Sequence, residues 1–195
     1  MLDLTSVFAA FPTLETERFV LRELTIDDLD AIYRMMSDER VTRYFGRAPM
    51  TSRDEAAGRI VSIRNDFRDQ NGVRWGIARR EGGELLGSCG YWRILRPHFR
   101  AEVGYELDPA CWGQGVMPEA LAAIARYGFE TMGLHTIEAN IDPENTGSRR
   151  VLEKLGFERE GLFRDSYYLP HEQRFSDTAT YSLLRTRWVE GESQG

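Results

Sequence analysis

The sequence predicts a single α/β (α+β) domain in which helices flank one sheet. The chain has 195 residues, of which 42% are hydrophobic, and this is enough to build one sizeable core. Runs of alternating apolar residues, typical of strands, are interspersed with runs in which apolar residues recur at helical spacing. No repeat, linker or low-complexity segment divides the chain, so we predict one domain rather than two.

The N-terminal residues are expected to form an arm, a strand and a helix. Residues 1–12 are predicted to form the N-terminal arm, or an extension of the first strand, whose apolar middle is Phe19–Leu21. Thr25 and Asp28 are spaced as in a capping box, which predicts a helix that extends to Met36. Packing of the apolar face explains this helix, and we assign it no functional role.

A second helix is predicted to begin at Thr51 or Ser52 and to end near Gly72. Four apolar residues recur on one face of it: Ala56, Ile60, Ile63 and Phe67. The segment before it, Tyr44–Gly46, places two aromatic residues in a loop. We expect this loop to form one wall of a substrate site.

The middle of the chain predicts strands. Trp75–Ala78 and Leu85–Trp92 are joined by a tight turn at Glu81–Gly83, which is typical of a hairpin. A turn at Arg96–His98 separates this hairpin from a further strand, Ala101–Leu107, whose apolar residues alternate. This last strand leads directly into a glycine-containing loop.

The glycine loop connects strand 101–107 to the central helix of the chain. Gly113 and Gly115 would let the backbone approach a ligand closely. Pro118 lacks an amide N–H and disfavours helical geometry in the residue before it, so we expect it in the first helical turn. The free amides at a helix start favour an anion such as a pyrophosphate. A glycine-rich turn that enters a core helix is the alternative.

The C-terminal part is expected to complete the sheet. Thr136–Ala139 is predicted as a strand, and Asn145 is a good N-cap for a helix that ends at a left-handed Gly156. Two further strands are predicted around Leu162–Leu169 and Ala179–Leu184.

The composition excludes several classes of function. The net charge is −6 with a pI near 5.2, and no basic run stands out, which disfavours nucleic acid and anionic membranes as partners. Two cysteines and three scattered histidines predict neither a disulfide framework nor a metal site. No apolar run approaches the roughly 20 residues of a membrane span, and no basic leader is present. We therefore expect a cytoplasmic location.

Five motifs along the chain resemble those of the GCN5-related N-acetyltransferases (GNAT). In order, they are Leu14–Arg22, Ala101–Tyr105, Cys111–Leu121, Asp142–Ser148 and Val151–Gly161. Within this superfamily they are similar to the RimJ/RimL branch, which acetylates protein N-termini and related amines. The resemblance extends from about Leu14 to Leu184. It implies a single mixed, mostly antiparallel sheet with splayed central strands, an N-acetyltransferase domain at 13–188 and a C-terminal tail at 189–195.

The resemblance implies acetyl-CoA as the co-substrate. The pantetheine arm is expected against the strand that ends at Leu107, in the gap between this strand and strand 136–141. The pyrophosphate is expected on the loop amides, which are those of Gly113, Gln114, Gly115, Val116 and Met117.

The reaction, attack of an amine on a thioester, requires removal of a proton from the amine. Glu102 is the first candidate for the base, because histone acetyltransferases carry a glutamate at a similar strand position. Glu138, on the neighbouring strand, is the second candidate, and each could instead be an ordinary charged strand residue. Asn145 and Ser148 match family positions near the pantetheine and the reacting thioester, so Asn145 is also expected to bind the coenzyme, although both residues could serve only the helix N-terminus.

The acceptor amine is the least defined partner. The branch resemblance favours a protein or peptide N-terminus, and the mixture of charges in segment 38–49 lacks the acidic cluster expected for a polyamine site. A small amine, such as a polyamine, an aminoglycoside or an amino-acid-like molecule, is the alternative acceptor. A non-catalytic module that binds acyl-CoA is the alternative to an enzyme. The chain is expected to be a monomer or a homodimer.

Overall fold

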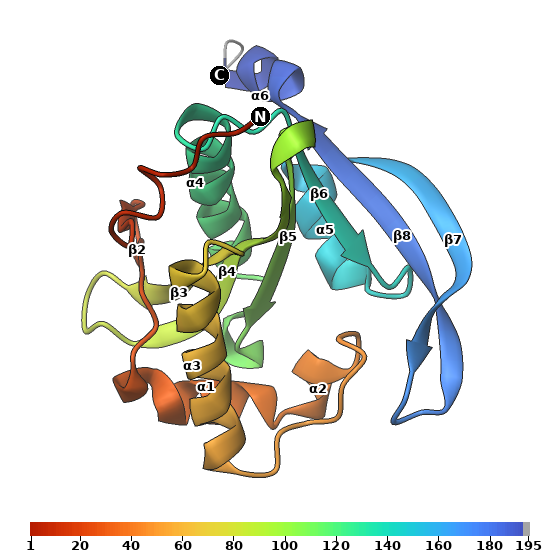
Figure 1. Cartoon of the computed structure of the whole chain (residues 1–195). Coiled ribbons are helices and arrows are strands. Elements are labelled where there is room, and N and C mark those ends of the chain that lie inside the picture. The colour runs from red at the N-terminus through yellow and green to blue at the C-terminus, as the bar shows by residue number, and fades with distance from the viewer. Residues whose placement is uncertain (193–195) are drawn as a thin grey trace.

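The computed structural model describes residues 1–192, which form one eight-stranded sheet with helices on both faces (Figure 1). The strands are β1 (Leu14–Glu15), β2 (Phe19–Arg22), β3 (Val73–Arg79), β4 (Leu85–Leu95), β5 (Arg100–Leu107), β6 (Thr136–Ile141), β7 (Glu158–Leu169) and β8 (Arg174–Leu184). Their order across the sheet is β1-β2-β3-β4-β5-β6-β8-β7. All neighbours are antiparallel except β5 and β6, which run parallel. The predicted mixed, mostly antiparallel sheet is confirmed.

The helices divide between the two faces of the sheet. In chain order they are α1 (Leu29–Met36), α2 (Glu39–Thr42), α3 (Arg53–Arg68), α4 (Val116–Glu130), α5 (Thr146–Lys154) and α6 (Arg185–Glu192). The buried residues of α1 and α3 pack with Leu24 and Leu85 in one cluster. The buried residues of α4 and α5 belong to a second, larger cluster that includes β3, β4 and β5.

The central helix α4 is fixed to the sheet by both apolar and polar contacts. Its predicted apolar face is buried, and Ile124 on this face has an exposed fraction of 1%. The hydroxyl of Tyr91 on β4 donates a hydrogen bond of 2.7 Å to the Ile124 carbonyl oxygen. Gly128 faces the same tyrosine ring, and a side chain there would overlap the Tyr91 hydroxyl. The Tyr91 ring therefore requires a glycine one turn after Ile124.

The capping residues that the sequence predicts occupy their expected places. The carboxylate of Asp28 accepts the Thr25 amide at 2.9 Å and the side chain of Asn145 accepts the Ser148 amide at 2.9 Å. Ser52 is the N-cap of α3, and Gly156 follows α5 with a φ of +84°. Helix starts and ends are thus specified locally, by side chains that satisfy otherwise free backbone groups.

The N-terminal segment 1–12 packs against the core. Leu2, Leu4 and Val7 are buried in the cluster beneath α4. The indole of Trp75 donates a hydrogen bond of 2.6 Å to the carbonyl oxygen of Pro12. The segment contains no strand, so it lies against the domain without extending the sheet.

Several boundaries differ from the prediction. Helix α3 ends at Arg68 rather than near Gly72, because the amides of Asn71 and Gly72 turn back to the carbonyl oxygen of Asp66. Strands β7 and β8 begin four and five residues earlier than predicted, at Glu158 and Arg174. The early part of β7 is largely exposed and the early part of β8 is mainly polar, so no apolar alternation marks them in the sequence.

Two helices were not predicted, the short α2 and the C-terminal α6. Helix α6 crosses the boundary at 188/189 that the sequence predicts between domain and tail. Residues 193–195 of the predicted tail lie outside the described part of the chain. Within residues 1–192 no helix is long and apolar enough to cross a membrane.

The feature that organises the site is the separation of β5 from β6. These parallel strands are paired only at Arg100–Glu102 and Thr136–Glu138. From Val103 onwards β5 has no partner on that side, while β6 continues to pair with β8 up to Ile141. The predicted splay of the central strands is confirmed, and it leaves two strand edges facing a gap.

Candidate active site

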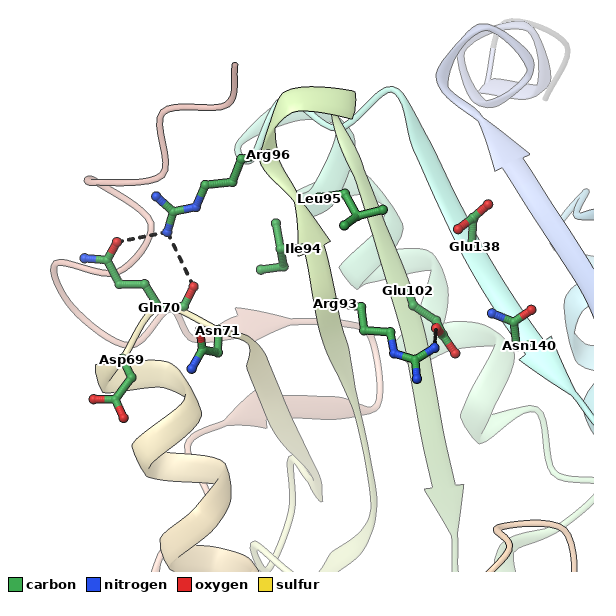
Figure 2. A pocket seen from close by; sticks show the side chains of 10 residues that line it. All are labelled: Asp69, Gln70, Asn71, Arg93, Ile94, Leu95, Arg96, Glu102, Glu138 and Asn140. Atoms are coloured by element: carbon green, nitrogen blue, oxygen red, sulfur yellow. Dashed lines mark hydrogen bonds and ion pairs between the residues drawn. The ribbon is translucent and has the colours of Figure 1, made fainter. Parts of the chain in front are cut away.

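The two predicted catalytic carboxylates lie where β5 and β6 separate. Glu102 and Glu138 are register partners, and they form the last pair before the gap opens. Figure 2 shows both side chains with Asn140 of β6 and Arg93 of β4 around a hollow of about 650 Å³. Glu102 also lines a second, larger cleft, so it lies between the two spaces.

Glu102 is the more deeply buried of the two glutamates. Its exposed fraction is 7%, and Nη1 of Arg93 lies 3.3 Å from its Oε2 atom. Burial raises the pKa of Glu102 because water no longer stabilises the carboxylate. The positive charge of Arg93 and hydrogen bonds from Asn140 and Arg93 oppose this effect without cancelling it. A carboxylate with a raised pKa is a stronger base than an ordinary glutamate.

Glu138 has a different partner. Its Oε1 atom is ion-paired with Nη2 of Arg100, which is the residue that begins β5. The side chain of Glu138 is partly exposed. Glu138 therefore pairs with Arg100 and Glu102 with Arg93, although the two carboxylates are register partners.

The glycine loop presents a row of free amides. Gly113 and Gly115 both have φ near +74°, and Gly115 is the N-cap of α4. Within the described residues, no hydrogen bond is made by the amides of Gly113, Gln114, Gly115, Val116 and Met117. The side chains of Val116 and Met117 are buried in the core. The loop therefore has the geometry of an anion site at a helix N-terminus.

Two side chains hold this loop in place. The indole of Trp112 donates a hydrogen bond of 2.9 Å to the carbonyl oxygen of Leu107 at the end of β5. The guanidinium of Arg18 donates to the Gln114 carbonyl oxygen at 3.0 Å and pairs with Glu119 at 2.6 Å. Helix α4 begins at Val116, so Pro118 lies in its first turn as predicted.

Asn145 and Ser148 are positioned together with a residue that sequence reasoning did not identify. The Asn145 side chain caps α5, so the simple structural role weighed for it is real. The Ser148 hydroxyl lies 2.6 Å from the hydroxyl of Tyr105 on β5. Burial raises the pKa of Tyr105, which keeps its phenol protonated at neutral pH. The contact connects β5 to α5, a separation of 43 residues in the sequence.

A second carboxylate of β5, Glu106, was also missed. Its side chain is 1% exposed, and its two oxygens accept from Arg59 of α3 at 2.7 Å and from Arg74 of β3 at 2.9 Å. The Ser88 hydroxyl also donates to it. Although burial acts in the opposite direction, the two arginines lower the pKa of Glu106 to about 2. A carboxylate held this firmly in its ionised form is a weak base.

The larger cleft has a volume of about 1390 Å³. It is bounded by α3, by β5 and β6, by the loop around Tyr44–Arg47 and by the hairpin of β7 and β8. The predicted aromatic loop lines this cleft. Gly46 packs against the ring of Tyr167 on β7, so the loop and the hairpin meet over the cleft. Within residues 1–192, no group of three His, Cys, Asp or Glu side chains is arranged to hold a metal ion.

Comparison with known proteins identifies the family. A family model described as an acetyltransferase (GNAT) domain matches residues 18–158. The uncharacterized N-acetyltransferase YoaA of Bacillus subtilis (strain 168) is 38% identical over 91% of this chain and 99% of its own length. The [ribosomal protein uS5]-alanine N-acetyltransferase of Escherichia coli (strain K12) is 30% identical over 91% of this chain and 93% of its own length.

Solved structures agree with these relatives. The crystal structure of the acetyltransferase (GNAT family) from Bacillus anthracis superimposes with a TM-score of 0.79 at 27% identity. The match covers 89% of this chain and 98% of that one. The family model spans the strand, the glycine loop and both candidate glutamates described above. The chain therefore belongs to the GNAT family and is an N-acetyltransferase, as its motifs predict.

Proposed function

We propose that this N-acetyltransferase transfers the acetyl group of acetyl-CoA to the N-terminal amine of a peptide or protein. The observation that supports this acceptor class is the extent of the cleft, which continues from the gap proposed for the coenzyme to α3, the Tyr44–Arg47 loop and the hairpin of β7 and β8, and so offers more room than a small amine needs. The 30% identity to an enzyme named for an alanine of ribosomal protein uS5 agrees with it. The cleft lining holds five arginines beside six carboxylates, so it lacks the strong excess of negative charge that would favour a polyamine acceptor.

The coenzyme is proposed to bind in the gap between β5 and β6. The free amides from Gly113 to Met117 would hold the pyrophosphate, since they lack other acceptors and lie at the N-terminus of a 15-residue helix. The unpaired edge of β5 after Glu102 would bind the pantetheine amides as a neighbouring strand does. This arrangement places the thioester near the point where the strands meet.

Glu102 is proposed to accept the proton of the acceptor amine, directly or through one water molecule. The amine nitrogen then attacks the thioester carbon, and the bond from carbon to sulfur breaks when the tetrahedral intermediate collapses. Tyr105, paired with Ser148, is the proposed donor of the proton that the leaving thiolate takes up, and the second proton lost by the nitrogen restores the Tyr105 hydroxyl. Glu138 and Asn145 are proposed to position these groups.

Competition between acceptors tests this proposal. Short peptides with small N-terminal residues, polyamines, aminoglycosides and free amino acids are offered at equal concentration with radiolabelled acetyl-CoA. We expect the label on the peptides, because only a peptide fills the length of the cleft. Label on polyamines or aminoglycosides alone would refute the peptide acceptor and leave the transferase intact. Absence of transfer to every amine would favour a module that only binds acyl-CoA.

A second prediction tests whether the loop amides bind the pyrophosphate. Gly115→Asp is expected to weaken acetyl-CoA binding at least tenfold, about 1.4 kcal/mol, because the new carboxylate repels the pyrophosphate. Gly115→Asn is the matched control. Asparagine has the same shape and tolerates the left-handed backbone of this position, but it is neutral. Calorimetric titration measures both, and equal affinity in the two folded variants would contradict an anion site at this loop.

A further inference from the structure

The floor of the larger cleft contains an excess of positive charge. Arg59 and Arg74 both pair with the buried Glu106, and Arg47 lies close enough for its charge to interact with all of them. Three guanidinium groups thus face a single carboxylate. Arg47 makes no hydrogen bond or ion pair of its own among the described residues, although two charged neighbours surround it.

The arginines of this group are not fully satisfied. The Nε atom of Arg59 is buried and has no hydrogen-bond partner. The charge of Arg59 lowers the pKa of both Arg47 and Arg74, which adds to the effect of their removal from water. Like charges in proximity cost free energy, and an anion bound beside the guanidinium groups would reduce this cost.

The other acidic residues of the cleft keep their charge, but the carboxylate whose charge raises the pKa of Arg47 and Arg74 is Glu106, and the others contact different residues. Glu102 faces Arg93, and Glu55 accepts hydrogen bonds from Thr51. Asp142 and Asp177 accept hydrogen bonds from Ser176 and from the amide of Asp165. The remaining carboxylate of the lining, Asp66, is exposed on α3. The cluster of Arg47, Arg59 and Arg74 therefore keeps a local positive excess in an acidic protein.

The arginine cluster and the proposed base lie on the same face of β5. Side chains two residues apart point to the same side of a strand, so Glu102 and Glu106 both face the cleft. Their Cα atoms are four residues apart, which corresponds to about 13 Å of strand. An extended peptide spans this distance with its first three or four residues. A free amino acid, whose amine and carboxylate are adjacent, does not.

We propose that the cluster of Arg47, Arg59 and Arg74 binds a carboxylate of the acceptor, and that the enzyme therefore prefers peptides with an acidic side chain near the N-terminus. This inference rests on the proposed function and adds the class of sequence that the site selects. Arg47 supplies the free guanidinium, and Arg59 supplies the second donor. Glu106 fixes the orientation of Arg59 and Arg74, and its negative charge offsets the repulsion between the guanidinium groups.

A purely structural role for these residues is the competing explanation. The pairs from Glu106 to Arg59 and Arg74 do join α3 and β3 to β5. This explanation does not account for Arg47, which forms no ion pair with a carboxylate among the described residues. Replacement of Arg47 should consequently change recognition of the acceptor carboxylate without changing the stability of the fold.

The experiment compares the purified full-length enzyme with its Arg47→Gln variant. The acceptors are tetrapeptides with an N-terminal alanine and an aspartate at the second, third or fourth position. Each is paired with the same peptide carrying asparagine, and free glutamate is paired with free glutamine. For the wild type we expect kcat/KM for an aspartate peptide to exceed that of its asparagine partner by roughly tenfold, mainly through KM. In Arg47→Gln this ratio is expected to fall to about threefold or less.

Arg53→Gln is the matched control, because Arg53 begins the same helix as Arg59 and pairs with Asp30 outside the cleft lining. It is expected to keep the ratio of the wild type. Equal kcat/KM for aspartate and asparagine peptides in the wild type would overturn the inference while leaving the peptide acceptor intact. An unchanged ratio in Arg47→Gln would also overturn it. Preference for free glutamate with no peptide turnover would refute the peptide acceptor and also the inference, because a free amino acid does not span the distance from Glu102 to the cluster. Turnover of polyamines alone would likewise refute both.

Discussion

Replacement of Glu102 by glutamine is expected to lower kcat by about 100-fold or more, with little change in the affinity for acetyl-CoA. Glutamine keeps the shape of the side chain and can still accept the hydrogen bond from Arg93. It cannot accept a proton, so the amine must lose its proton to water without help. Steady-state kinetics with saturating peptide, together with calorimetric titration of acetyl-CoA, separates the catalytic effect from binding.

The dependence on pH supplies an internal check on this assignment. If Glu102 is the base, activity requires its ionised form, so kcat/KM is expected to rise with pH through the raised pKa of this group. Arg93 holds that pKa down, and Arg93→Gln should move the acidic limb of the profile to higher pH. Glu138→Gln is the matched control. A large loss in Glu138→Gln with none in Glu102→Gln would reverse the assignment, and no loss in either would point to proton transfer through water alone.

Glu106→Gln is expected to destabilise the fold by about 3 kcal/mol, because it leaves two largely buried guanidinium groups without their counter-ion. The depression of its pKa to about 2 agrees with this size, since each pKa unit corresponds to about 1.4 kcal/mol. For a domain of this length, the midpoint of thermal unfolding should fall by roughly 6–12 °C. Chemical denaturation at pH 7 gives the free energy of unfolding directly.

The same residue predicts how stability depends on acid. Its pKa is lower in the folded state than in the unfolded state, so its contribution is complete above about pH 4.5 and is lost as the pH falls towards 2. The difference in unfolding free energy between the wild type and Glu106→Gln should therefore shrink over this range. Glu84→Gln removes an exposed carboxylate that pairs with Arg79, and we expect a change below about 0.5 kcal/mol. Equal losses in the two variants would contradict the buried-pair explanation.

Much of the fold could be predicted because local signals specify it. The alternation of Val103, Tyr105 and Leu107 and the helical spacing of Leu121, Ile124 and Ala125 each identify an element without reference to the rest of the chain. The beginnings of β7 and β8 could not be found in this way. The side chains that begin β7 are mostly exposed and those that begin β8 are mainly polar, and pairing between the two strands, rather than burial of an apolar face, makes them strands.

In the site, too, local motifs could be predicted from the sequence and contacts between distant residues could not. Gly113 and Gly115 form a continuous motif, so sequence alone identifies the loop. Glu106 receives its partners from positions 47 and 32 residues away, and Tyr105 meets Ser148 over 43 residues. Nothing in the spacing of these residues indicates that they meet. A glutamate two residues after Gly104, on the same strand face as Glu102, was the one available signal.

The brief pairing of β5 with β6 also has a mechanical consequence. Strands β1 to β5 form one antiparallel ladder and β6 to β8 another, and three residue pairs are all that joins the ladders edge to edge. Twisting one half of the molecule against the other therefore breaks few backbone hydrogen bonds, and the line between Glu102 and Glu138 is the natural hinge of the sheet. The angle at this hinge is set mainly by α4, which covers the larger core, and by the contact of Tyr105 with Ser148. We therefore expect a molecule that bridges the two open edges to stiffen this hinge, and so to couple occupancy of the gap to the rigidity of the backbone.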